Sequence, residues 1–377
     1  MALLHSLAHT IWNRQGLGGK LGWAALVPFA LGFSALARGR NILYDRGLLP
    51  SERLPFHIIS VGNLTVGGTG KTPFVLWLAR ALQARRHSVG IVCRGYKGRN
   101  SGVTTVGTNG HSQTTPAEVG DEAVMLARAF SGVVLAGRDR VQAARLAHKN
   151  FGLNVLILDD GFQHRRLGRS LDLVLIDARQ GIGNGWLLPA GPLREPLSAI
   201  RRTDIVILTK GQNLQDQNLQ DQNLQDLQNL PLSFDTHAKP CFRADLRPTA
   251  LIQLEHGQWR EMPASLLAQK RVMTVSGVAD PALFYRFVRD EGAEIGEVME
   301  FPDHHVYTQR DWQAMTTASH RCDLIVTTEK DLVKLEKFPF AAGKLVALRV
   351  EMVVKEADQL LTHIEHRLGD TKQETCK

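Results

Sequence analysis

The sequence predicts an α/β protein with a mostly parallel sheet, helices on both faces of that sheet, and a second, smaller α/β domain. Short apolar runs such as HIISVGN and NVLILDD recur from about residue 57. Amphipathic segments such as TPFVLWLARALQARR separate these runs. Continuous apolar strands that alternate with amphipathic helices are typical of a parallel sheet covered on both faces. The alternation starts again after about residue 240, which predicts the second domain.

An apolar segment near the N-terminus, residues 21–36, contains about 16 residues without a charge and has cations at both ends. A helix that spans a bilayer needs roughly 20 apolar residues, so this segment is slightly short. Trp23 and Phe29 suit an interfacial anchor. We therefore predict a membrane-associated helix within residues 1–50, which either dips into one leaflet or spans the bilayer. The alternative is an ordinary buried helix.

The charge balance favours an acidic partner. Lys and Arg number 45 against 37 Asp and Glu, which gives a formal net charge of +8. Nucleic acid, a phosphorylated substrate and an anionic membrane would each suit this excess. Aromatic residues make up only 6% of the chain, and neither a zinc-finger spacing nor an RNA-binding signature is present. We therefore expect no nucleic acid partner. The four cysteines are scattered and form no CxxC pair, which fits reduced thiols.

Residues 65–73, TVGGTGKTP, lie between an apolar run and a helical one and end like a phosphate-binding loop (P-loop). In such a loop, successive backbone N–H groups line a nest at a helix N-terminus, where the dipole favours an anion. Lys71 would reach the β- and γ-phosphates, and the Thr72 hydroxyl would hold Mg²⁺. The usual pattern has glycine at position 65, where this chain has threonine. The predicted nucleotide-binding residues of this loop are Thr65, Val66, Gly67, Gly68, Thr69, Gly70, Lys71 and Thr72.

The loop makes residues 51–210 a P-loop NTPase-like domain, which also needs a carboxylate at the end of a neighbouring strand. The run NVLILDDG supplies Asp159 and Asp160 at such a position. A guanine-specific site would carry the signature [NT]-K-x-D, which Thr209 and Lys210 begin. The Asp of that signature is absent, because Gln212 occupies its place. ATP is therefore the expected nucleotide.

Two acidic segments offer candidates for a group that accepts a hydroxyl proton during phosphoryl transfer. Asp121 and Glu122 open a helical run, and on spacing alone Asp121 fits a helix cap. The run Asp303-His304-His305 lies in the second domain, and its residue types would also fit a surface loop. The basic residues that recur in loops include Arg140 and Arg194.

The two domains are separated by a predicted linker, residues 211–240. Within it, residues 212–226 repeat the unit QNLQD three times. A leucine at every fifth position matches neither a helix face nor a strand face, so we expect a solvated insertion. Residues 241–377 form the predicted smaller α/β domain, and ligands of two-lobed proteins tend to lie between the lobes.

Eight segments, taken together, resemble the tetraacyldisaccharide 4'-kinases, which phosphorylate a lipid A precursor at the inner face of the bacterial inner membrane. The N-terminal apolar helix is one, and the others are SVGNLTVGGTGKTP, CRGYKG, VGDEA, LDDGFQHRRL, LLPAGPLREP, FPDHH and TTEKDLVK. They run in order over nearly the whole chain. The family's phosphate-binding loop also lacks the first glycine, so the resemblance implies that residues 65–73 bind a nucleotide.

The resemblance also implies a reaction and a set of site residues. ATP with Mg²⁺ would phosphorylate the 4'-hydroxyl of an anionic glycolipid, tetraacyldisaccharide 1-phosphate, at the cytoplasmic face of the bacterial inner membrane. Asp121 would deprotonate that hydroxyl, oriented by His304. The implied catalytic residues are Asp121, His304, Lys71 and Arg194; the implied metal site comprises Thr72, Asp159, Asp160 and Glu122; and the weaker phosphate or metal-shell contacts include Gln163, His164 and Arg140.

Two alternatives stay open from the sequence. A nucleotide-gated, membrane-associated P-loop ATPase switch would bind ATP and recruit a partner without phosphorylating it. A membrane scaffold with a relic loop would bind no nucleotide, which fits poorly with the intact Lys71 and Thr72.

Overall fold

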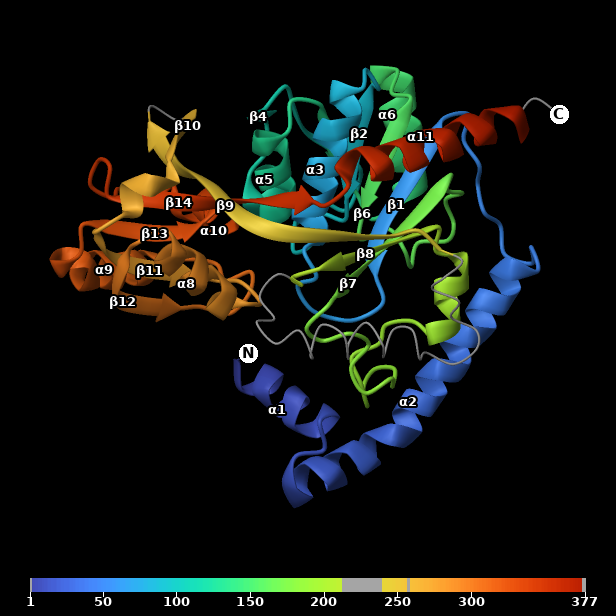
Figure 1. Cartoon of the computed structure of the whole chain (residues 1–377), viewed down its shortest axis with the longest axis horizontal. Coiled ribbons are helices and arrows are strands. Elements are labelled where there is room, and N and C mark those ends of the chain that lie inside the picture. Colours follow the sequence, from blue (N-terminus) through green and yellow to red (C-terminus); the bar gives the residue numbers. More distant parts are fainter. Residues whose placement is uncertain (1, 212–238, 256–257, 375–377) are drawn as a thin grey trace.

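One 14-stranded sheet runs through both lobes of the protein (Figure 1). The structure is a computed structural model that describes residues 2–211, 239–255 and 258–374. Along the sheet the strand order is β12 (Glu294–Glu300), β11 (Arg271–Ser276), β13 (Leu324–Thr328), β14 (Leu345–Val354), β9 (Cys241–Glu255), β8 (Ile205–Thr209), β7 (Leu171–Asp177), β1 (His57–Asn63), β6 (Val155–Asp159), β2 (Val89–Cys93), β5 (Val133–Ala136), β3 (Thr104–Thr108) and β4 (His111–Ser112), and β10 (Gln258–Pro263) pairs with β9.

The first lobe has the parallel sheet that the sequence predicts. The strands from β8 to β5 are parallel to one another, and β3 then pairs with β5 in the antiparallel direction. Successive side chains of a strand point to opposite faces. In β1, Ile59 therefore packs in one core cluster with α3 (Lys71–Ala84) and α5 (Asp121–Ala129), and Ile58 packs in another with α6 (Arg140–Phe151). Helices thus cover both faces, as predicted.

A short helix, α4 (Pro116–Val119), directly precedes α5. Gly120 separates the two helices with a φ of 89°. A Cβ atom added at Gly120 would meet the carbonyl oxygen of Tyr96 at 2.4 Å, so only glycine fits this position. The break makes Asp121 the first residue of α5 and brings it close to the loop that contains Tyr96.

The second lobe repeats the alternation of strands and helices. Its helices are α8 (Pro281–Asp290), α9 (Gln309–Ala318) and α10 (Glu329–Leu335), with short 3-10 turns at Ala264–Leu267 and Ser319–Arg321, and a further 3-10 turn in the first lobe at Leu197–Arg202. Two core clusters lie on the opposite faces of its strands. Strand β9 pairs with β8 of the first lobe at one end and is antiparallel to β14 along its length. These two long strands connect the lobes (Figure 1).

The C-terminal helix α11 (Ala357–Glu374) returns to the first lobe. Its Leu360, Ile364 and Leu368 are buried in the same cluster as Leu82 of α3, and Figure 1 shows the helix beside α3. Helix α11 therefore packs on the first lobe, although it follows β14 in the chain. The division of the chain at residues 241–377 stays a prediction. The QNLQD repeat lies outside the described residues.

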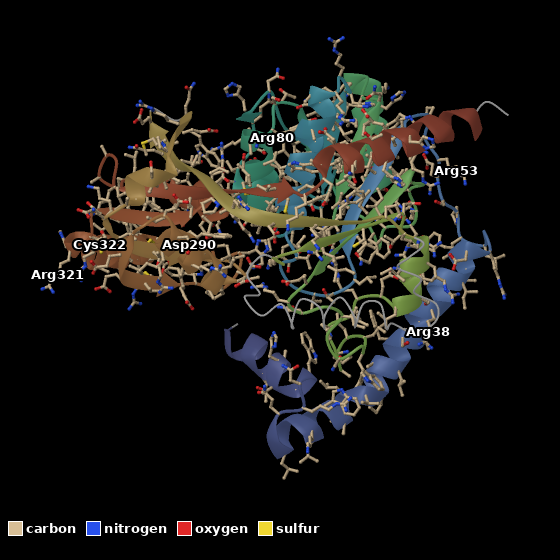
Figure 2. The ribbon with its side chains drawn as sticks, viewed as in Figure 1. Arg38, Arg53, Arg80, Asp290, Arg321 and Cys322 are labelled. Atoms are coloured by element: carbon tan, nitrogen blue, oxygen red, sulfur yellow. The ribbon has the colours of Figure 1, made fainter. Side chains whose placement is uncertain are left out.

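The N-terminal region forms two helices, α1 (Ala2–Trp12) and α2 (Gly16–Asp45). The second contains 30 residues and is longer than the apolar segment that predicts it, because the helix continues through the charged residues on both sides. Its length and hydropathy would allow it to cross a membrane, and only 6% of its most apolar window is buried. Leu21, Phe29 and Leu36 are exposed, and Arg38 lies on the same helix (Figure 2). The alternative of a buried core helix is wrong for this segment.

Candidate active site

The P-loop connects β1 to α3 at the carboxyl edge of the parallel strands. Gly70 caps α3 with a φ of 82°, and Gly67 has a φ of 116°, conformations that favour glycine. Residues from Val66 to Pro73 line a cleft of about 620 Å³. Residues of the second lobe, including Ala279 and Lys330, line the same cleft. The loop therefore faces a space between the two lobes, where the N-terminus of α3 favours an anion.

Thr65 replaces the expected glycine without strain, because its backbone has no positive φ. Its carbonyl accepts a hydrogen bond of 2.6 Å from Nδ2 of Asn63, and it forms an antiparallel bridge with Leu193. The Val66 N–H bonds to the carbonyl of Pro192 at 2.8 Å. The start of the loop is thus paired with residues 192–193. Val66 lines the cleft, and Thr65 is not among the described residues that line it.

Thr72 and Asp159 lie together on one side of the cleft. The Thr72 hydroxyl donates a hydrogen bond of 3.0 Å to Oδ2 of Asp159. The other oxygen, Oδ1, is buried and has no partner among the described residues. Burial raises the pKa of Asp159 to about 7, the charge of Glu122 adds to this, and Lys71 opposes it. An orphaned carboxylate oxygen beside a hydroxyl is a donor set that fits Mg²⁺.

No group of three or more His, Cys, Asp and Glu side chains within the described part of the chain has the spacing of a complete metal site. In nucleotide enzymes, Mg²⁺ commonly binds through one or two carboxylates and completes its coordination with phosphates and waters. Glu122 lines the same cleft and is close enough to add to the pKa shift of Asp159.

Asp160 forms ion pairs with two cations in the cleft. Its carboxylate receives two hydrogen bonds from Arg194, at 2.8 and 3.1 Å, and lies 3.5 Å from Nζ of Lys71. Burial would raise its pKa, but Lys71 and Arg194 outweigh that effect and lower it to about 2. Asp160 thus fixes a lysine and an arginine beside the P-loop, where both can neutralise phosphate charge.

Asp121 and His304 meet across the lobes. Nδ1 of His304 lies 2.9 Å from Oδ1 and 3.1 Å from Oδ2 of Asp121. Burial would raise the pKa of Asp121, but the hydrogen bond from His304 and the charge of Lys330 hold it below its ordinary value. His305 instead contacts Asp311 within its own lobe, at 3.1 Å. The structure therefore brings His304, rather than its neighbour, to the aspartate.

Lys330 is a site residue to which sequence reasoning gave no role. It is the second residue of α10. Its Nζ lies 2.7 Å from Asp303, 3.2 Å from Nε2 of His304 and 3.6 Å from Glu122. Burial would lower its pKa, but Glu122, Asp121 and Asp303 raise it. The only signal in the sequence was the segment TTEKDLVK, which does not show where Lys330 points.

Gln163 and Arg140 are not among the described residues that line the cleft, and their expected contacts with phosphate stay predictions. Arg140 is 3% exposed, and its guanidinium donates to the carbonyls of Cys93, Gly137 and Asp159. Gln163 donates to the carbonyl of Asn63 at 2.9 Å. Both side chains hold strand ends in place through these hydrogen bonds.

Comparison with known proteins identifies the family. The family model for LpxK, tetraacyldisaccharide-1-P 4'-kinase, matches residues 22–369. The chain belongs to the tetraacyldisaccharide 4'-kinase family. A family member from Syntrophus aciditrophicus is 42% identical over 84% of this chain and 85% of its own. One from Anaeromyxobacter dehalogenans is 39% identical over 93% of this chain and 92% of its own.

A solved tetraacyldisaccharide 4'-kinase structure, LpxK from Aquifex aeolicus in complex with ATP, has the same fold. Its TM-score is 0.74 and its sequence identity 32%, over 92% of this chain and 99% of the Aquifex chain. The match is too extensive to be confined to one lobe. The resemblance inferred from eight short segments is thereby confirmed.

Proposed function

We propose that this protein transfers the γ-phosphoryl group of ATP to the 4'-hydroxyl of tetraacyldisaccharide 1-phosphate, which gives the 4'-phosphorylated lipid A precursor (lipid IVA). The observation that carries this proposal is the Asp121–His304 pair, which adjoins the same cleft as the P-loop in a member of the 4'-kinase family. A nucleotide switch needs a phosphate site but no proton acceptor. A kinase that acts on an alcohol needs both.

ATP would bind with its phosphates along Gly67, Gly68, Thr69, Gly70 and Lys71. Thr72 and Asp159 would hold Mg²⁺, with Glu122 nearby. Asp160 would orient Lys71 and Arg194. Mg²⁺ held by Thr72 and Asp159 would supply positive charge that offsets the charge developing on the phosphates during transfer. Lys71 and Arg194 would add positive charge on the same side, where they are already fixed by Asp160 at 3.5 and 2.8 Å.

Asp121 would accept the proton of the sugar hydroxyl. Its pKa lies below its ordinary value, so the carboxylate is ionised and able to accept at neutral pH. His304 would orient the carboxylate and share the charge through Nδ1, while its Nε2 faces Lys330. Because His304 belongs to the second lobe, the pair is complete only when the two lobes adjoin. Closing the cleft in this way would also exclude water from the transfer.

The glycolipid would reach the cleft from the cytoplasmic face of the bacterial inner membrane. Helix α2 supports this placement through its exposed apolar side chains, such as Phe29, and its basic residues. Its C-terminal end is tied to the first lobe, because Arg40 and Asn41 both bond to the buried Glu195 at 2.8 Å. A substrate that stays in the bilayer could thus be presented to an enzyme held at its surface. We propose no nucleic acid partner.

The test is transfer of labelled γ-phosphate from ATP to detergent-dispersed tetraacyldisaccharide 1-phosphate, with wild-type protein beside Lys71→Ala. Labelled lipid from the wild type, lost in the variant, supports the kinase proposal. ATP hydrolysis without labelled lipid would instead support the nucleotide-gated switch.

A further inference from the structure

Two consecutive residues, the last of β8 and the one after it, bond to the backbone of the P-loop. The Thr209 hydroxyl donates to the carbonyl of Thr69 at 2.9 Å, and Nζ of Lys210 donates to the carbonyl of Gly68 at 2.5 Å. A peptide unit is planar, so a fixed carbonyl also fixes the direction of the next N–H. These contacts therefore set the shape of the loop at the residues that would meet the phosphates.

Lys210 is itself held tightly. Its side chain is 6% exposed and lies 3.3 Å from Asp177 of β7 and 3.3 Å from Asp280. Its backbone has a φ of 61°, a left-handed conformation that a lysine keeps only where its surroundings impose it. A buried ammonium needs such carboxylates, because an unpaired charge is costly away from water.

Asp280 brings the second lobe into this contact. Its Oδ1 caps α8 by accepting the N–H of Leu283 at 3.2 Å, and its Oδ2 lies 2.7 Å from Arg179 as well as 3.3 Å from Lys210. Burial would raise the pKa of Asp280, but the hydrogen bond from Arg179 and the charge of Lys210 lower it. The same carboxylate thus starts a helix of one lobe and binds two cations of the other.

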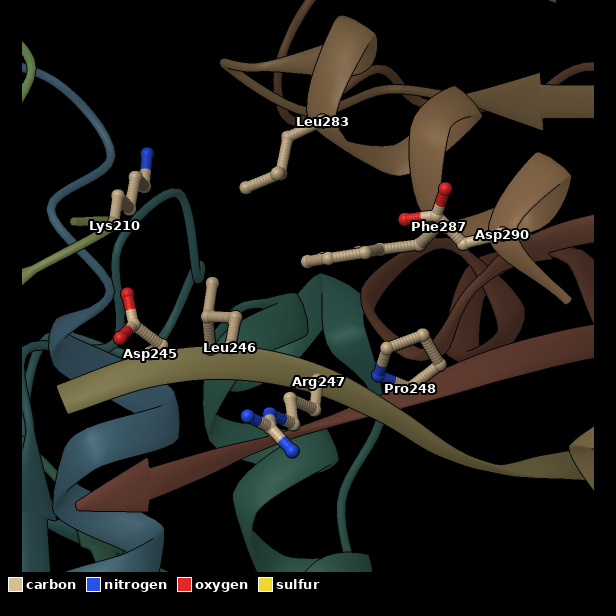
Figure 3. A pocket seen from close by; sticks show the side chains of 8 residues that line it. All are labelled: Lys210, Asp245, Leu246, Arg247, Pro248, Leu283, Phe287 and Asp290. Carbon is tan, nitrogen blue, oxygen red and sulfur yellow. The ribbon is translucent and has the colours of Figure 1, made fainter. Parts of the chain in front are cut away.

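The space beside this contact is not filled. Lys210, Leu246 of β9, and Leu283 and Phe287 of α8 line a cavity of about 170 Å³ between the lobes (Figure 3). Arg247 and Asp290 also line this cavity and are exposed, so the cavity opens to solvent. The ion pair with Asp280 is therefore a polar link beside an open part of the boundary between the lobes.

We propose that Lys210 is a positioning residue for the nucleotide: it holds the carbonyl of Gly68, and its ion pair with Asp280 makes that hold depend on the position of the second lobe. This inference rests on the proposed ATP site and adds a route by which the lobe that supplies His304 also sets the shape of the P-loop. Productive binding of ATP and assembly of the Asp121–His304 pair would then be linked.

Arg179 provides a matched control. Like Lys210, it is a cation that binds both Asp177 and Asp280, at 3.0 and 2.7 Å. Unlike Lys210, within the described residues Arg179 makes its side-chain hydrogen bonds to these two carboxylates and none to the P-loop. If the lobes merely need to adhere, the loss of either cation should have the same effect. If Lys210 acts on the loop, only its loss should weaken the nucleotide site.

The experiment measures the dissociation constant of Mg·ATP for the full chain in detergent by titration calorimetry. The variants are Lys210→Met, Arg179→Met, Asp280→Asn and the double variant Lys210→Met/Asp280→Asn. Asparagine at position 280 keeps the acceptor that caps α8 but removes the charge. Thermal melting without nucleotide reports whether each variant is folded. Labelled transfer to the lipid is measured on the same samples.

We expect Lys210→Met to raise the dissociation constant about tenfold or more and Arg179→Met to leave it within about twofold of wild type. Asp280→Asn should raise it several-fold alone but add little in the Lys210→Met background. Equal effects of Lys210→Met and Arg179→Met, or an unchanged constant in Lys210→Met, would overturn the inference while leaving the kinase intact. Wild-type protein that binds no Mg·ATP would overturn the proposed function and this inference together.

If Lys210→Met does not fold, the comparison of Asp280→Asn with Arg179→Met decides. A larger rise in the dissociation constant for Asp280→Asn supports a route through Lys210, because Arg179→Met removes only the other cation. Equal rises contradict it.

Discussion

Nδ1 of His304 lies 2.9 Å from Oδ1 of Asp121, although 183 positions separate the two residues in the chain. Asp121 begins a helix of the first lobe, and His304 lies between β12 and α9 of the second. The contact combines a proton acceptor with a histidine that can orient it. Its two halves come from different lobes, so the pair reports on the position of one lobe relative to the other.

Replacing Asp121 by alanine should abolish phosphoryl transfer while ATP still binds. The carboxylate accepts the proton in our proposal, and within the described part of the chain it contacts His304 and Lys334 rather than the P-loop. A loss of kcat of about 10²–10⁴ is typical for a general base. The measurement is labelled transfer beside calorimetric titration of Mg·ATP. An equal loss of ATP binding would count against Asp121 as the base.

Replacing His304 by glutamine should lower kcat by roughly 10–100-fold, because the carboxylate then lacks its orienting partner. His305→Gln is the matched control, since His305 contacts Asp311 in its own lobe. That variant should keep activity within about threefold of wild type. Steady-state transfer assays on the two variants test the difference. Similar losses of kcat in both variants would assign the effect to the loop that contains the two histidines rather than to the Asp121–His304 pair.

Replacing Thr72 by valine should raise the Mg²⁺ concentration that gives half-maximal activity by about tenfold or more, because the hydroxyl is a proposed ligand. The substitution keeps the side-chain shape at the start of α3. In the presence of EDTA, the affinity for free ATP should match wild type. Unchanged Mg²⁺ dependence would remove Thr72 from the metal site.

Acid stability should depend on His164. Burial and the nearby Arg140 lower its pKa to about 4, below the ordinary value of 6.5. Its neutral form therefore stabilises the folded state fully above about pH 6.5, and this contribution is lost as the pH falls through 4. His164→Gln should lose less stability than wild type across that range, by on the order of 2 kcal/mol. Denaturant unfolding at pH 7 and pH 4.5 tests this, and parallel losses in the two proteins would contradict it.

Deleting residues 1–36 should weaken sedimentation with anionic vesicles, because the cut removes the exposed Leu21, Phe29 and Leu36. The fold should survive, since Arg40 and Asn41 remain and keep their bonds to Glu195. Circular dichroism checks the fold of the truncated protein. If the folded truncation still sediments as before, the membrane contact lies in basic patches of the two lobes.

The strands and helices of the first lobe were predictable because each one carries its own pattern. Apolar runs such as residues 57–63 and 155–159 are buried on both faces, so their composition indicates strands directly. The P-loop was predictable for a similar reason, since its glycines and Lys71 are adjacent in the chain. Strand β9 and helix α11 were not identified, because what they pack against lies far away in the sequence.

The sequence by itself determined the parallel sheet, the P-loop and, through short segments, the family. These features are local: a strand, a turn and a helix N-terminus are specified by neighbouring residues. The tertiary structure alone decided which residues meet. It turned Arg140 inward to three carbonyls, joined Asp121 to His304, and placed Lys210 between Gly68 and Asp280. Such contacts join residues that lie far apart in the chain. A local pattern of residues does not specify which distant residue a side chain will meet.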